Sequence, residues 1–165
     1  MRTNVRYNKG PVQDLLNAVV VQAAEDYREY SGRLLVNPED REAAEGMEEV
    51  KSFFLSEDFC FYTRVEGGYI LKKLEEEKRV SAALFSEFRE KTGMLVEIWH
   101  EFSASGYQDT GKLEKADSLI IRVKEIREKP PNGWKKLFVF KTAEKRAIKN
   151  IERWRKEYER KNEYT

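Results

Sequence analysis

Apolar residues at helical spacing constrain the fold of the first part of the chain. Between positions 12 and 31 they recur every three or four residues, as Val12, Leu15, Leu16, Val19, Val20, Ala23 and Tyr27. Side chains at these intervals share one face of an α-helix. The pattern predicts an amphipathic helix over 12–31, and Gly32 is suited to end it.

A second helix is predicted directly afterwards. Asn37 has the side chain of a helix N-cap, and Pro38 suits the first helical position. The expected apolar face consists of Ala43, Met47, Val50 and Phe54. A short connection between the two helices predicts an antiparallel hairpin. A turn and a short helix near 68–78 are expected to follow.

The pattern changes after Ser81. A helix is expected around Leu84 and Phe88, with Thr92 and Gly93 at its end. Three segments then read as strands, because they alternate in polarity or are short apolar runs: LVEIWHEF (95–102), SLIIRVKEI (118–126) and LFVFK (137–141). A last helix is expected from Thr142. Its apolar stripe would contain Ala143, Ala147, Ile148, Ile151, Trp154 and Tyr158.

Together these elements predict an α+β fold with two lobes. The first, over 1–79, is a helical N-terminal lobe built on the hairpin. The second, over 80–165, is an αβββα lobe with a three-stranded antiparallel sheet and a basic C-terminal helix. A chain of 165 residues is long enough to bury a core without a metal or disulfide.

Charge is distributed unevenly along the chain, although the formal net charge is only +1. Residues 1–80 contain 12 Lys and Arg against 16 Asp and Glu, a balance of −4, whereas residues 81–165 contain 19 against 14, a balance of +5. This asymmetry predicts an acidic surface and a basic surface.

The cysteine content and the apolar runs predict a cytoplasmic protein. Cys60 is the single cysteine, which excludes an intrachain disulfide and fits a reducing cytosol. No apolar run approaches the roughly 20 residues of a membrane span. The N-terminal residues have no apolar segment of the kind found in secretory signals. We therefore expect no membrane contact.

Few residues are suited to catalysis or cofactor binding. Cys60 lies among aromatic residues and is expected to be a buried, inert thiol, while Gly67 and Gly68 read as a turn rather than a phosphate-binding loop. His100 is the single histidine, and no close metal-ligand spacing occurs. A catalytic alternative would use His100, Glu97 or Glu101. We expect no enzymatic activity, no metal and no cofactor.

Three motifs in the first half resemble those of a known group of proteins. They are AAEDYREY (23–30), VNPEDREAAEGMEEVKSFFLSEDF (36–59) and TRVEGGYIL (63–71). The matching positions are Asp26, Tyr27, Asn37, Pro38, Phe53, Phe54, Ser56, Phe59, Val65, Glu66, Gly67 and Ile70, whereas Gly68 departs from the pattern. The first half thus resembles short proteins encoded by phages and integrative elements of low-GC Gram-positive bacteria.

This resemblance implies a helical accessory protein of a mobile element, with no catalytic assignment. Such proteins often bind a host macromolecule and change its activity, and inhibitors of CRISPR effectors are one prominent class. The favoured function is therefore non-catalytic binding to a host protein or ribonucleoprotein, most notably inhibition of a defence nuclease such as a CRISPR effector. The oligomeric state stays open.

The last helix carries the basic candidate surface. Opposite its apolar stripe we expect an outer row of cations: Lys145, Lys149, Arg153, Lys156 and Arg160, with Lys135 and Lys136 in the preceding turn. Glu144, Glu152 and Glu159 dilute this row, and Glu152 is spaced for an ion pair with Lys156. A solvated helix face without a ligand is the alternative interpretation of the same pattern.

The other predicted surface is acidic, and the two surfaces suggest different partners. The acidic surface consists of Glu39, Asp40, Glu42, Glu45, Glu48 and Glu49 on the second helix, which could meet a basic nucleic-acid channel. The basic row could instead meet an acidic protein or a bound guide RNA. The alternative function is direct binding of double-stranded RNA or DNA by the basic helix. The order of elements after Ser81 is similar to that of a double-stranded RNA-binding domain, although that family's Lys-Lys-x-Ala-Lys motif does not occur.

Overall fold

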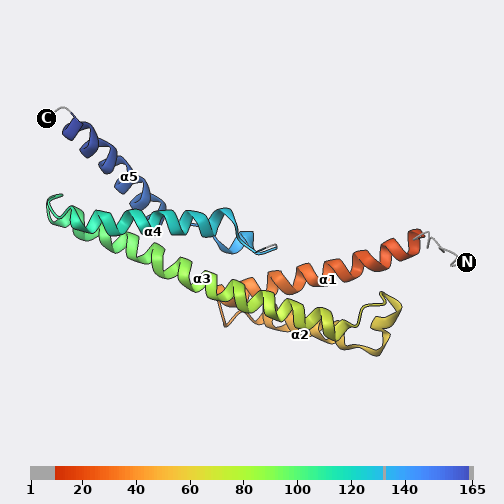
Figure 1. Cartoon of the computed structure of the whole chain (residues 1–165). Helices are drawn as coiled ribbons and strands as arrows, with labels where there is room; N and C mark the ends of the chain where they lie inside the picture. Colours follow the sequence, from red (N-terminus) through yellow and green to blue (C-terminus); the bar gives the residue numbers. More distant parts are fainter. Residues whose placement is uncertain (1–9, 132, 164–165) are drawn as a thin grey trace, which may run out of the picture. The chain divides into compact units, whose positions relative to one another are not determined.

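A computed structural model describes residues 10–131 and 133–163. The elements in order are α1 (Pro11–Val36), α2 (Arg41–Leu55), the 3-10 helix η1 (Glu57–Phe61), α3 (Gly67–Ala104), α4 (Gly111–Glu128), the 3-10 helix η2 (Lys135–Leu137) and α5 (Thr142–Glu163). The chain forms two compact units, one up to Val80 and one from Ser81 onward. Figure 1 shows that α3 is one continuous helix that contributes to both units.

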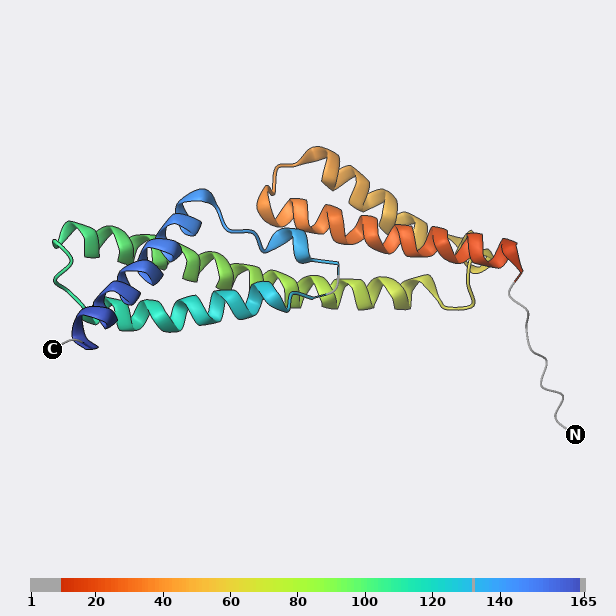
Figure 2. The same cartoon turned by 90° about the horizontal axis from the view of Figure 1, so that it is seen from above.

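Within the first unit, α1 and α2 form the hairpin that the sequence predicts (Figure 2). The helix expected over 12–31 extends to Val36. The buried core consists of Tyr27 from α1, Met47, Val50 and Phe54 from α2, Phe59 from η1, and Leu71 and Leu74 from α3. Full burial of such side chains contributes roughly 1.5–3 kcal/mol each. The aromatic rings of Phe53, Phe54 and Phe59 meet edge to face or tilted at 5.3–5.6 Å.

The start of α2 differs from the sequence prediction. Asn37 is the C-cap of α1, and its Oδ1 accepts a hydrogen bond from the Glu39 backbone N–H at 3.2 Å. Asp40 is the N-cap of α2 and accepts the Ala43 N–H at 3.0 Å. Both side chains can cap a helix, so the choice between them depends on where the chain turns. Pro38 therefore lies in the turn rather than in the helix.

The expected three-stranded sheet is wrong, because all regular structure in the described residues is helical. The segment LVEIWHEF lies inside α3, which also continues through Thr92 and Gly93. Its buried residues Leu95, Ile98 and Phe102 are spaced by three and four positions and continue the helical spacing of Phe88 and Thr92. The alternation over eight residues was thus part of a longer helical period.

The segment SLIIRVKEI is also helical and forms the second half of α4. Its buried residues continue a row of helical spacing that begins earlier in that helix: Leu113, Ala116, Leu119, Ile120, Val123 and Ile126. Because the row starts before residue 118, the apolar run alone could not distinguish a strand from a helix.

The segment LFVFK is the part of the prediction that is nearest to a strand. From Phe138 to Lys141 burial alternates, with Phe138 and Phe140 buried and Val139 and Lys141 exposed. Both phenylalanine rings pack on Phe88 of α3, at centroid distances of 5.6 and 5.3 Å. The buried side chains of this alternating segment are therefore covered by a helix and not by a neighbouring strand. Without a sheet, the similarity in element order to a double-stranded RNA-binding domain does not hold.

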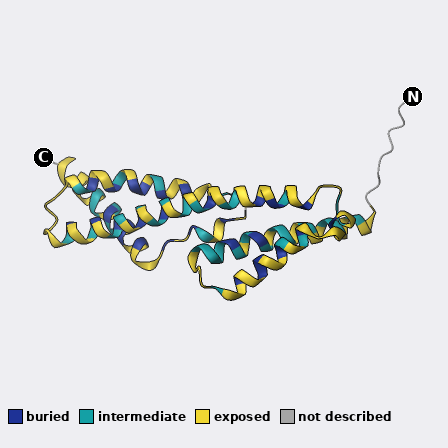
Figure 3. Ribbon diagram, turned by 90° about the horizontal axis from the view of Figure 1, so that it is seen from below, coloured by how far each residue is buried: buried dark blue, intermediate teal, exposed yellow. Residues whose placement is uncertain are grey.

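The last helix begins at Thr142, as predicted, and packs on α4 in the second unit. Ala147, Ile148 and Ile151 are buried, as expected for its apolar stripe. Ala143, which the sequence placed on that stripe, is exposed, and Glu144 is buried in its place. Figure 3 shows how burial varies along the helices, and in α5 the residues from Lys156 to Glu163 are all exposed.

Gly67 and Gly68 are the first two residues of α3 rather than a separate turn, and they differ in the space around them. A Cβ on Gly67 would lie 1.8 Å from the Phe54 carbonyl oxygen, whereas a Cβ on Gly68 meets nothing within 4 Å. Close approach of two backbones is a position that only glycine fits.

We expect Gly67→Ala to lower the free energy of unfolding by about 1–3 kcal/mol, because the carbonyl of Phe54 must move away. Gly68→Ala is the matched control and should be neutral or stabilising by about 0.4–1 kcal/mol, since it reduces the entropy of the unfolded chain. Urea unfolding of both variants measures the difference. Equal stability of the two would contradict the close packing of α2 on α3.

Candidate functional site

The predicted cations of the last helix are all on the surface of α5. Lys145, Lys149, Arg153, Lys156 and Arg160 are exposed. At 100° per residue they lie within an arc of about 80° around the helix. From the first to the last, the row extends over about 22 Å. We call these five residues the basic row.

The buried carboxylate of Glu144 determines the direction in which this row faces. One of its oxygens accepts the backbone N–H of Lys141 at 2.7 Å, which satisfies a free donor at the start of α5. The same carboxylate lies 3.2 Å from Arg89 Nη1 and accepts the Thr92 hydroxyl at 3.0 Å. Both partners belong to α3, so the first turn of α5 is attached to α3 through its acidic side.

Arg89 extends this attachment to the segment before α5. Its Nη2 donates to the Val139 carbonyl at 2.9 Å. The guanidinium also lies over the ring of Phe88, at 4.9 Å from the centroid. Arg89 thus contacts the segment before α5, the first turn of α5 and an aromatic side chain of α3 at the same time.

The acidic residues of α5 leave most of the basic row without an ion pair. Arg153 pairs with Glu157 at 3.1 Å. The expected pair of Glu152 with Lys156 is not formed, because Glu152 pairs with Lys124 of α4. In the described part of the chain, the other four cations of the row have no carboxylate within 4.0 Å. Exposed Arg146 lies beside the row and was not singled out from the sequence.

Lys135 and Lys136 do not belong to α5. Both are exposed and lie in η2, between the buried residues Trp134 and Phe138. They remain a predicted part of the basic surface.

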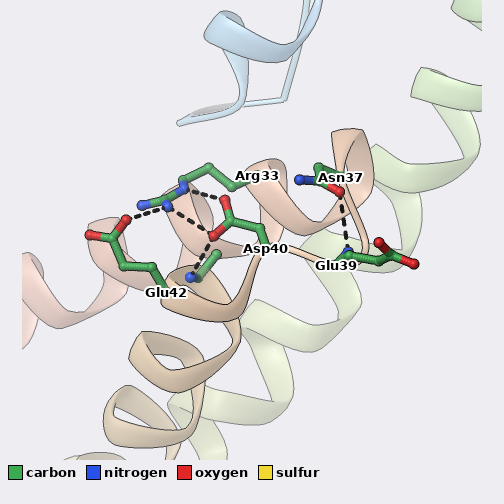
Figure 4. A network of polar contacts seen from close by, with 6 residues as sticks. Arg33, Asn37, Glu39, Asp40 and Glu42 are labelled. Atoms are coloured by element: carbon green, nitrogen blue, oxygen red, sulfur yellow. Dashed lines mark hydrogen bonds and ion pairs between the residues drawn. The ribbon is translucent and has the colours of Figure 1, made fainter.

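Arg33 of α1 binds two carboxylates of the predicted acidic surface, those of Asp40 and Glu42 (Figure 4). Its Nε and Nη2 donate to the two oxygens of Asp40 at 2.9 and 3.0 Å, and Nη2 also donates to Glu42 at 2.8 Å. Hydrogen bonds from Arg33, followed by the bond from the Ala43 N–H, hold the pKa of Asp40 below its ordinary value. Asp40 and Glu42 therefore stabilise the α1–α2 connection.

The remaining predicted acidic residues are exposed on α2 or just before it. Glu48 lies 3.4 Å from Lys51, while Glu39, Glu45 and Glu49 have no cation within 4.0 Å among the described residues. Asp40 and Glu42 are thus bound to Arg33 and Glu48 has a local ion pair, whereas the other three predicted carboxylates have no described cation partner.

The groups considered for catalysis are dispersed. His100 and Glu97 are exposed on α3, and Glu101 pairs with Lys112 at 2.5 Å. This hydrogen bond holds the pKa of Glu101 below its ordinary value. Cys60 is exposed rather than buried. No three His, Cys, Asp or Glu side chains among residues 10–131 and 133–163 come together in a way that could hold a metal ion.

Two further bidentate ion pairs have no signal in the local sequence. Arg28 of α1 binds Glu77 of α3 at 2.8 and 3.0 Å, and Arg122 of α4 binds Glu87 of α3 at 2.7 and 3.0 Å. These partners are more than 30 residues apart, so no local spacing indicates them. The capping role of Glu144 did have a local signal, because it is a glutamate at the third position of a helix.

No protein-family model matches this chain, and neither a curated protein nor a solved structure shows significant similarity to it. None of the helices in the described residues is long and apolar enough to cross a membrane. The likeness of the first half to phage and integrative-element proteins stays a prediction.

Replacing Glu144 by Gln should destabilise the second unit. The change leaves the half-buried guanidinium of Arg89 without its carboxylate and should cost about 2–3 kcal/mol, because the partly solvated arginine loses less than a fully buried one. Glu157→Gln, which removes an exposed pair on the same helix, should cost about 0.5 kcal/mol or less. Urea unfolding compares the two. Similar losses would show that Glu144 does not anchor α5.

The contribution of Asp40 should depend on pH. Its pKa is lowered in the folded chain relative to the ordinary value of 3.8. The stabilisation is therefore complete above about pH 4 and is lost as the pH falls through the folded-state pKa.

Unfolding of wild type and Asp40→Asn across the range from pH 7 to pH 2 tests this expectation. The difference in stability should shrink at the acid end, while Asn retains the N-cap. Glu45→Gln, which has no described cation partner, should show no such trend. A constant difference for Asp40→Asn would contradict the role of Arg33.

Proposed function

We propose that this chain is a non-catalytic phage or mobile-element protein that binds and inhibits a host defence nuclease, such as a CRISPR effector. Its contact surface is the basic row of α5. The observation that supports this choice is the exposure of the row, of which Arg153 alone has a carboxylate partner among the described residues. The phage setting comes from the resemblance of the first half.

The structure favours the basic row over the acidic surface of α2 as the contact. Three of the six predicted carboxylates have an internal cation, because Arg33 binds Asp40 and Glu42 and Lys51 lies near Glu48. Four cations of the basic row carry no such internal neutralisation. An unpaired charge keeps its full interaction with a charged partner, whereas a paired charge must first give up its own ion pair.

A row of cations on one side of a helix suits a ligand with regularly spaced negative charges. Phosphate groups along a nucleic-acid strand have this property, and lysine and arginine bind them without reading sequence. The guide RNA or bound nucleic acid of a defence ribonucleoprotein is therefore the expected point of contact. Occupying it would prevent the nuclease from engaging its target.

A tagged pull-down from host lysate, with and without nuclease treatment, tests whether a protein complex is the target. We expect a specific protein partner in both samples, because an inhibitor contacts the effector as well as its RNA. Loss of every partner after nuclease treatment would contradict inhibition of a protein machine. Activity of the recovered nuclease, with and without added chain, then measures inhibition directly.

Direct binding of nucleic acid is the second candidate, and the length of the basic row favours it. About 22 Å of α5 can follow several successive phosphates. Neutralising three cations of the row, Lys145, Lys149 and Arg153, should then weaken binding to any sequence. The slope of log affinity against log salt concentration should fall by about one for each phosphate that no longer binds a cation.

A matched control separates this effect from a change in net charge. Alanine at Lys72, Lys115 and Lys129 removes three exposed cations that lie outside α5. Binding of labelled RNA and DNA duplexes to both triple variants, at several salt concentrations, measures the difference. If both triple variants bind the duplexes equally weakly, binding depends on the net charge of the chain and not on the basic row. Unchanged binding in the α5 variant would exclude the basic row.

A further inference from the structure

A hollow of about 300 Å³ lies between α1 and α2 in the first unit. Its lining residues are Val19, Gln22, Ala23 and Asp26 from α1, and Glu49, Val50 and Phe53 from α2. Four of these side chains are apolar and form a floor open to solvent. The floor is the outer edge of the core, since Ala23 and Phe53 also pack against its buried residues.

The apolar surface continues along α1 beyond the hollow. Val12 and Leu15 precede Val19 by seven and four positions and are 70% and 66% exposed. Residues at this spacing share one side of a helix, so all three lie in one row. From Val12 to Asp26 the row extends over about 21 Å. We call this row and the hollow together the α1–α2 groove.

The rim of the groove is acidic. Of the seven residues that line the hollow, Asp26 and Glu49 carry a negative charge and none carries a positive one. Asp26 Oδ1 accepts a hydrogen bond from the neutral Gln22 amide at 2.7 Å, and no cation lies within 4.0 Å of Glu49 in the described part of the chain. Glu29 and Glu45, each within four residues of a rim carboxylate, are also exposed.

We propose that the α1–α2 groove binds an amphipathic helix of a protein partner, with a basic edge. An apolar floor between two helices accepts apolar side chains spaced at i, i+3, i+4 and i+7 on a partner helix. Lysine or arginine beside that apolar face would meet Asp26 and Glu49. The acidic rim repels nucleic acid, so this surface selects a different class of ligand from the basic row of α5. The assignment goes beyond the proposed function and does not depend on it.

The length and charge of the groove specify a probe. Fourteen residues, or about 21 Å of helix, match the row from Val12 to Asp26. The probe is a fluorescein-labelled peptide of leucine and lysine, with leucine at helical spacing and lysine elsewhere. One comparison peptide carries glutamate in place of lysine. Another has the leucine–lysine composition in a scrambled order without an apolar stripe.

Two variants of the full chain form a matched pair for this test. Val19→Lys puts a charge on the floor of the groove, while Val21→Lys makes the same change at an exposed position of α1 outside the lining. Fluorescence anisotropy should show saturable binding of the lysine peptide to wild type. We expect about tenfold or greater weakening by Val19→Lys, because a like charge opposes the peptide, and little change with Val21→Lys.

Reversing the charge of the two rim carboxylates tests whether the groove prefers a basic peptide. The double variant Asp26→Lys with Glu49→Lys should lose the lysine peptide and bind the glutamate peptide instead. Circular dichroism checks that each variant keeps its helices.

Several outcomes would overturn the proposal. They are equal binding of the scrambled peptide, equal effects of Val19→Lys and Val21→Lys, and no saturable binding by wild type. Sedimentation of the chain alone covers a further possibility. A dimer that Val19→Lys dissociates would assign the groove to a second copy of the chain and would also overturn the proposal.

Discussion

The arrangement of the second unit depends on the contacts that the buried carboxylate of Glu144 makes. It satisfies a backbone donor at the start of α5 and binds Arg89 and Thr92 of α3. A buried carboxylate without these partners would be costly, so the helix has one favourable rotation about its axis. In that rotation Ile148 and Ile151 face the core and the basic row faces solvent. Exposure of the basic row is therefore a consequence of how the helix is anchored.

Ion pairs divide the charged residues of this chain into two groups. Carboxylates with bidentate arginine partners join elements, as Glu77 and Glu87 of α3 do with Arg28 and Arg122. Such pairs have a defined geometry and are stronger than single hydrogen bonds. Four cations of the basic row and the rim carboxylates of the α1–α2 groove are among the described charges without such a partner, and they are available to ligands. The two proposed surfaces thus arise from residues that the folded chain does not use to hold itself together.

Local sequence patterns predicted the fold where a complete helical period is visible. For α1 and α2, several turns of regular spacing and a strong turn signal made the hairpin predictable. In α3 and α4 the segments that were interpreted as strands were too short to show the helical period. LVEIWHEF and SLIIRVKEI are each part of a longer helix that begins earlier in the chain. Phe138 and Phe140 alternate as strand residues do, yet they pack on Phe88 of a helix. Periodicity reports which side of a segment is buried, and it does not report what covers that side.

The order of amino acids alone accounts for the amphipathic character of α5, the helical spacing of its cations and the opposite charge balances of the two halves. These properties depend on composition and on the 100° angle between successive helical residues, both of which are local. Which of these charges remain without an ion pair depends on how the helices pack. Arg33 meets Asp40 and Glu42 because α2 turns back on α1, and Glu152 meets Lys124 because α4 lies beside α5. A contact between distant segments depends on packing, which no single segment encodes.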